Sequence, residues 1–135
     1  MMQKKALVFI FALVIISLNT GCGTDSTVTC NLEMYKEQTF PLMSVFSEVM
    51  DETQLGDAVS RAEARDKFEA LLVRINNVEC RESFPLKHET LEYAVRHTIS
   101  ALEYADKGDY EMATQLMNKA SINIDAFFDW TMDID

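Results

Sequence analysis

The sequence is poor in the residues from which the common catalytic and cofactor-binding motifs are built. It has 4 glycines and 2 histidines among 135 residues. Glycine-rich phosphate loops, nucleophile elbows, zinc-binding histidine pairs and haem-attachment motifs do not occur in it. We therefore expect a protein that is not an enzyme and that holds no metal and no cofactor.

Basic residues are also scarce. The chain has 12 Lys and Arg residues against 22 Asp and Glu residues, and its formal net charge is −10 at pH 7. Because proteins bind the phosphates of nucleic acids through Lys and Arg, this balance argues against a nucleic acid partner. It also opposes electrostatic attachment to an anionic lipid surface. A basic or cationic partner is compatible with it.

Hydrophobic runs are short. A largely apolar run from Ala6 to Leu18 follows Lys4 and Lys5. A membrane-spanning helix takes about 20 apolar residues, whereas the apolar core of an export signal takes about 7–15. The pattern predicts a signal peptide over residues 1–21 and hence a location outside the cytoplasm.

The end of this segment adds a lipid anchor to the prediction. Thr20 and Gly21 are small and precede Cys22, and with the apolar run they resemble the signal of bacterial lipoproteins, although Asn19 stands where that family usually has Leu. The resemblance implies that Cys22 is acylated, becomes the new N-terminus and holds the protein on a membrane. Because Gly23 follows, the outer membrane or cell surface is favoured. Ordinary cleavage to a soluble secreted protein is the alternative.

The rest of the chain predicts a single helical domain. Residues 22–30 are mostly small and polar, which is typical of a flexible tether. From residue 31 the apolar residues recur every three or four positions, which predicts an all-α domain over residues 31–135: an antiparallel up-down four-helix bundle made of two helical hairpins. Its last helix should bury Phe127 and Phe128. The expected helices span about residues 31–55, 57–78, 85–107 and 109–132.

Cysteine use is consistent with this topology. If Cys22 carries the lipid, Cys30 and Cys80 remain as a pair in an oxidising compartment, where disulfides persist. Cys30 precedes the first helix and Cys80 follows the second, so both should lie at the same end of the bundle. We expect a disulfide between them, with two free buried thiols as the alternative.

Two short glycine-containing turns are expected to join the helices of each hairpin. Gly56 and Gly108 are predicted to take the left-handed conformation that ends a helix. Asp57 and Asp109, which follow them, are predicted to cap the next helix. Short links of this kind make successive helices antiparallel.

The start of the first helix is less certain from the sequence. Asn31 is a favourable N-cap, which places the start at that residue. Pro41 lies further along the same segment, so the helix either kinks there or begins near Thr39. The sequence leaves both alternatives open.

A stretch near the last turn resembles a known helical repeat. Residues 108–113, Gly-Asp-Tyr-Glu-Met-Ala, together with Lys119 and Ala120, are similar to the turn and second helix of a tetratricopeptide repeat. The match covers about one hairpin, whereas such repeats need about three copies to form a continuous core. The resemblance implies hairpin packing and slightly favours a protein-binding role.

Four residues form the candidate binding surface. Tyr93, His97 and Tyr104 lie on one line of the third expected helix, away from its core stripe, and Trp130 lies to one side of the last. Residues of this kind bind a ligand or partner, or else cover the flanks between helices.

The predicted function is that of a membrane-anchored extracytoplasmic lipoprotein acting as a non-catalytic interaction or accessory module of the cell envelope. Its expected partners are the membrane, through lipidated Cys22, and an envelope protein. A periplasmic helical bundle that binds a small molecule or a metal is the alternative.

Overall fold

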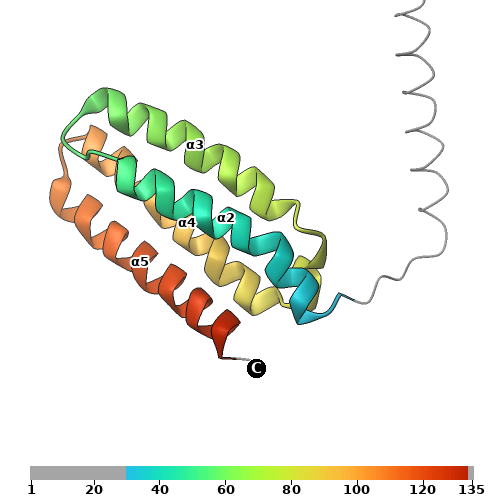
Figure 1. Ribbon diagram of the computed structural model, residues 1–135. Helices are drawn as coiled ribbons and strands as arrows, with labels where there is room; N and C mark the ends of the chain where they lie inside the picture. Colours follow the sequence, from blue (N-terminus) through green and yellow to red (C-terminus); the bar gives the residue numbers. More distant parts are fainter. Residues whose placement is uncertain (1–29, 134–135) are drawn as a thin grey trace, which may run out of the picture.

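The computed structural model describes residues 30–133, which form a bundle of four α-helices (Figure 1). This range contains no strand, so the predicted all-α four-helix bundle is confirmed. The predicted signal peptide and the tether up to residue 29 lie outside the described residues. The helices are α2 (Leu32–Glu52), α3 (Ala58–Asn76), α4 (Pro85–Asp106) and α5 (Tyr110–Met132), and the 3₁₀ helix η1 (Glu79–Ser83) joins α3 to α4.

Side-chain caps define where three of the helices begin. The carboxylate of Asp57 accepts a hydrogen bond from the backbone N–H of Ser60 at 2.9 Å, and that of Asp109 accepts one from Met112 at 3.0 Å. The side chain of Asn31 accepts from the N–H of Met34 at 2.9 Å. Each bond satisfies one of the backbone donors left open at a helix start. The predicted caps are therefore confirmed.

The structure decides between the two alternatives for the first helix. α2 begins at Leu32 and continues through Pro41 to Glu52. A proline inside a helix removes the hydrogen bond to the carbonyl four residues earlier, here that of Glu37. Both Glu37 and Pro41 are exposed, so that carbonyl lies on the water side of the helix.

The turn at Gly108 has the predicted geometry. Gly108 has φ 81°, its N–H donates to the carbonyl of Ala105 at 3.0 Å, and the N–H of Asp109 donates to the carbonyl of Tyr104 at 2.9 Å. These two bonds are those of the Schellman motif, in which a left-handed residue ends a helix. The motif reverses the chain between α4 and α5.

The prediction for Gly56 is wrong, because Gly56 does not have a positive φ. α2 already ends at Glu52, and Thr53 follows in an extended conformation. The chain then reverses through a turn in which the N–H of Asp57 donates to the carbonyl of Gln54 at 3.1 Å. With the helix ended three residues earlier, no left-handed residue is needed at Gly56.

The two glycines therefore differ in their expected tolerance of a side chain. Gly108→Ala should lower the free energy of unfolding by about 1 kcal/mol or more, since an L-residue is strained at positive φ. Gly56→Ala should be neutral or stabilise slightly, because a Cβ there meets no atom within 4 Å. Chemical denaturation of both variants measures the difference, and equal losses would contradict it.

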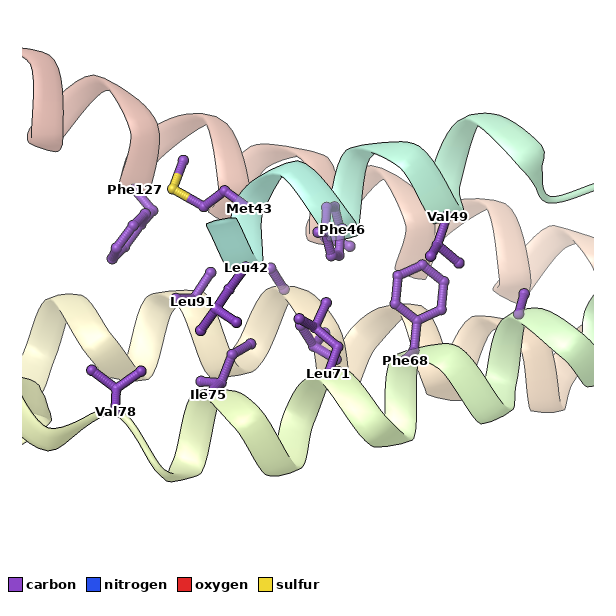
Figure 2. Close-up of a cluster of buried hydrophobic side chains, with 14 of the residues drawn as sticks. Leu42, Met43, Phe46, Val49, Phe68, Leu71, Ile75, Val78, Leu91 and Phe127 are labelled. Atoms are coloured by element: carbon purple, nitrogen blue, oxygen red, sulfur yellow. The ribbon is translucent and has the colours of Figure 1, made fainter. Parts of the chain in front are cut away.

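The core runs through the middle of the bundle and is built from all four helices (Figure 2). Phe46 of α2 packs against Phe68 of α3 with ring centroids 5.5 Å apart. α5 buries Phe127, as predicted, but Phe128 is 47% exposed, so its predicted burial is wrong. Consecutive helical residues point about 100° apart, and Phe127 takes the position that faces the core.

An ion pair between buried Arg61 and exposed Asp106 fastens the bundle at the end opposite Cys30. Arg61 of α3 donates from Nε to Asp106 at the end of α4 at 2.7 Å, and from its guanidinium to the carbonyl of Leu55 at 2.6 Å. Arg65 adds a second contact to Asp106 at 3.1 Å. The hydrogen bond from Arg61 holds the pKa of Asp106 below its ordinary value. One arginine thus joins the loop after α2 to α3 and α4.

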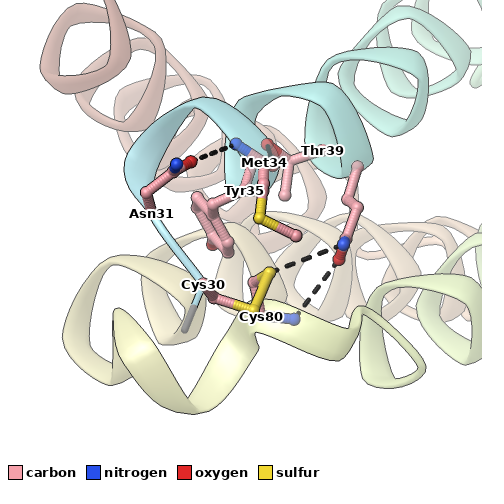
Figure 3. The surroundings of a disulfide bond; sticks show 7 residues. Cys30, Asn31, Met34, Tyr35, Thr39 and Cys80 are labelled. Carbon is pink, nitrogen blue, oxygen red and sulfur yellow. Dashed lines mark hydrogen bonds between the residues drawn. A yellow bond between two sulfur atoms is a disulfide. The ribbon is translucent and has the colours of Figure 1, made fainter. Parts of the chain in front are cut away.

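The predicted disulfide is present at the other end. Cys30 and Cys80 are bonded, with Cα atoms 5.4 Å apart, and Cys80 is buried in η1 (Figure 3). Gln38 of α2 supports the same segment, because its side-chain oxygen accepts from the N–H of Cys80 at 3.3 Å and its amide nitrogen donates to the sulfur at 3.5 Å. The bridge therefore fixes the start of α2 to the connection between α3 and α4.

Loss of this bridge should destabilise the domain. Cys80→Ser should lower the free energy of unfolding under oxidising conditions by up to about 4 kcal/mol, the chain-entropy value for a loop of this length. Thermal unfolding with and without reductant tests this. Reduced wild type should melt with the variant, and reductant should not change the variant. Equal melting of oxidised wild type and variant would contradict a stabilising bridge.

Candidate binding site

Aromatic rings from α2, from α5 and from the residue before α4 cluster at the disulfide end of the bundle. Tyr35 of α2 is fully buried, and its ring centroid lies 4.9 Å from that of Phe84, 6.1 Å from that of Phe127 and 6.0 Å from that of Trp130. Trp130 also has the Nζ of Lys87 5.5 Å from its ring centroid. Trp130 is thus half-buried over the end of the bundle, which is how an amphipathic ring caps a core.

A buried histidine completes this end cluster. His88 is only 5% exposed, and its Nδ1 is hydrogen-bonded to the hydroxyl of Tyr35 at 2.9 Å. Its Nε2 is buried and has no hydrogen-bond partner among the described residues. Burial lowers the pKa of His88 and outweighs the raising effect of the Glu92 carboxylate. Burial also raises the pKa of Tyr35, so both groups of the pair are neutral at pH 7.

The other three residues of the candidate surface lie on α4. The rings of Tyr93 and His97 are stacked with centroids 6.1 Å apart, and the hydroxyl of Tyr93 donates to Glu89 at 2.8 Å. Tyr104 lies further along the helix, with the Nζ of Lys107 5.3 Å from its ring centroid. Exposed Tyr93 and half-buried His97 therefore form one pair, whereas Trp130 belongs to the end cluster.

The seam between α2 and α5 contains a groove that the sequence did not indicate. Its volume is about 510 Å³, within the range of about 300–1,000 Å³ typical of ligand pockets. Met43 is buried beneath it, whereas Phe40 and Phe128 are 37% and 47% exposed along its sides. The lining residues are Phe40, Met43, Ser44 and Ser47 from α2, and Ile124, Asp125 and Phe128 from α5.

The opening lies where two helices do not pack closely, because α2 makes close contacts with α3 but approaches α5 little. α2 presents Ser44 and Ser47 to the groove. At the seam between α2 and α3, by contrast, the large ring of Phe46 packs against that of Phe68. The small side chains of Ser44 and Ser47 do not fill the space between α2 and α5. The groove has the volume of a ligand pocket and exposes two aromatic side chains, and it is therefore the candidate binding site.

Membrane-spanning and metal-binding features are absent from the residues that the structure describes. Within residues 30–133, no helix has the length and apolar content of a membrane span. In the same residues, His, Cys, Asp and Glu side chains do not gather in groups of three or more that could hold a metal ion.

Comparison of the chain with protein-family models, curated proteins and solved structures gives no match.

The buried histidine predicts a pH-dependent stability. In the unfolded chain His88 titrates near its ordinary pKa of 6.5, whereas in the folded protein its pKa is lower. Below about pH 6.5 the unfolded chain therefore binds a proton that the folded chain does not. Stability should be complete above that pH and should fall as the pH drops toward the folded pKa.

Unfolding measurements between about pH 5 and 8 test this dependence. His88→Gln should flatten the profile in that range, because it removes the group that takes up the proton. His97→Gln, at a half-buried position on the same helix, is the matched control and should keep the slope that depends on His88. A profile that is equally steep in wild type and His88→Gln would contradict the assignment.

Proposed function

We propose that the protein is a membrane-anchored extracytoplasmic lipoprotein that serves as a non-catalytic interaction or accessory module of the cell envelope. Cysteine use is the observation that carries this proposal. The bridge takes Cys30 and Cys80 of the 3 cysteines, which leaves Cys22 as the one available for acylation. A disulfide also agrees with an oxidising compartment, to which a signal peptide over residues 1–21 would deliver the chain.

The distance along the chain sets how the domain would stand on a membrane. Seven residues lie between Cys22 and Cys30, so an extended tether of eight residue steps reaches at most about 28 Å. Cys30 lies at the disulfide end of the bundle, and the turn at Gly108 lies at the other end. The disulfide end would therefore face the lipid and the Gly108 turn would point away from it.

Charge supports a domain that stands off the lipid surface. Residues 1–21 include two of the 12 basic residues and none of the acidic ones, so cleavage would leave a formal charge of −12. An acidic body is repelled by anionic lipid headgroups, and attachment then depends on the acyl chains. The exposed aromatic residues beside the α2–α5 groove are the features that favour a partner-binding role.

The anchor is tested by removing its attachment point. Cys22→Ala should release the protein from the membrane fraction into the soluble extracytoplasmic fraction, because no acyl chain can be added. Fractionation and intact mass spectrometry measure the change. Cys30→Ser/Cys80→Ser, which keeps Cys22, is the control and should stay with the membrane. A Cys22→Ala protein that remains bound with no other change in mass would refute the anchor.

A further inference from the structure

We propose that the α2–α5 groove binds an amphipathic helix of a partner protein, with its apolar side chains between Phe40 and Phe128 and a Lys or Arg residue against Asp125. The inference rests on the proposed role as an interaction module and names the chemistry of the partner. It depends on the shape, composition and charge of the groove.

The length and composition of the groove suit a helix. From Phe40 to Ser47 the lining covers about two turns, or 10 Å, of α2. Helices that bind in grooves use apolar anchors spaced over a similar distance, at positions i, i+3 or i+4 and i+7. Phe40 and Phe128 offer aromatic sides, and the flexible thioether of Met43 adapts to the side chain above it. Ser44 and Ser47 are small and allow a second backbone to approach.

The charge of the groove determines which helix fits. Asp125 is the charged residue of the lining. Asp51 lies one turn beyond the lining on α2, and Asp129 directly follows Phe128 on α5, both at exposed positions. Lys36 lies one turn before the lining on α2. Carboxylates therefore predominate around the groove, which favours a basic helix and disfavours an acidic one.

Two other occupants fit less well. A second copy of this chain would bring together two bodies of formal charge −10 or more negative, which repel each other. An acyl chain from Cys22 would fill apolar space but would gain nothing from Asp125. A basic amphipathic helix uses both the apolar sides and the carboxylate.

Binding to a defined probe tests the proposal. The probe is a fluorescently labelled helical peptide of about 18 residues, with Leu on one face and Lys on its flanks. The control peptide is the same except that Glu replaces each Lys. Anisotropy is measured with the purified full chain carrying Cys22→Ala, so the outcome does not depend on lipidation. The Lys peptide should bind with a Kd below about 1 mM and at least tenfold more tightly than the Glu peptide.

Variants then locate the binding surface. Phe40→Ala and Phe128→Ala should each weaken binding of the Lys peptide about tenfold, because they remove aromatic anchors. Asp125→Asn should reduce the preference for Lys over Glu and the salt dependence of binding. Ile122→Ala is the matched control, since Ile122 is 67% exposed on the same helix but does not line the groove, and it should bind as wild type does.

Several results would overturn the proposal while leaving the anchor proposal untouched. These are no binding of the Lys peptide at about 1 mM, equal binding of both peptides, or the same loss in Ile122→Ala as in Phe128→Ala. Concentration-dependent dimerisation that Phe128→Ala abolishes would assign the groove to a second copy. Binding by the Cys22→Ala chain but not by the lipidated chain in vesicles of neutral lipid would assign it to an acyl chain.

Discussion

The disulfide between Cys30 and Cys80 is the constraint on which one end of the bundle depends. It joins the start of α2 to η1, which is the connection between the two hairpins. Tyr35, one turn into α2, is thereby held where its ring meets aromatic rings from the start of α4 and the end of α5. The ion pair between Arg61 and Asp106 fastens the hairpins at the opposite end. The first hairpin is thus fixed to α4 at both ends, and the opening lies in the seam between α2 and α5.

Much of the fold could be predicted from the sequence because its signals are local. Helix starts depend on a capping side chain within three residues, and Asn31, Asp57 and Asp109 were identified in this way. Gly56 was misassigned because the end of α2 is decided by Thr53, whose extended backbone has no sequence signature. The path of α2 through Pro41 also needed the structure, since the neighbouring residues permit either a start or an interior proline.

The candidate site was less predictable because it depends on contacts between helices distant in sequence. The groove exists because α2 and α5 are separated. The spacing of apolar residues along one helix does not indicate how far that helix lies from another. The one available signal was the pair Phe127 and Phe128, two large aromatics too wide for a single core stripe. His88 and Arg61 were missed for the same reason, since their partners Tyr35 and Asp106 lie 53 and 45 residues away.

The position of the bridge also decides how the domain would carry mechanical force. Consider a pull between the tether before Cys30 and the end of α5. The force passes from Cys30 through the disulfide to Cys80, because the two residues are covalently linked with Cα atoms 5.4 Å apart. Residues 31–79 then form a closed loop outside the path of the pull. A helix resting on α2 and α5 would therefore stay in contact with an unstretched α2 while α4 and α5 bear the strain.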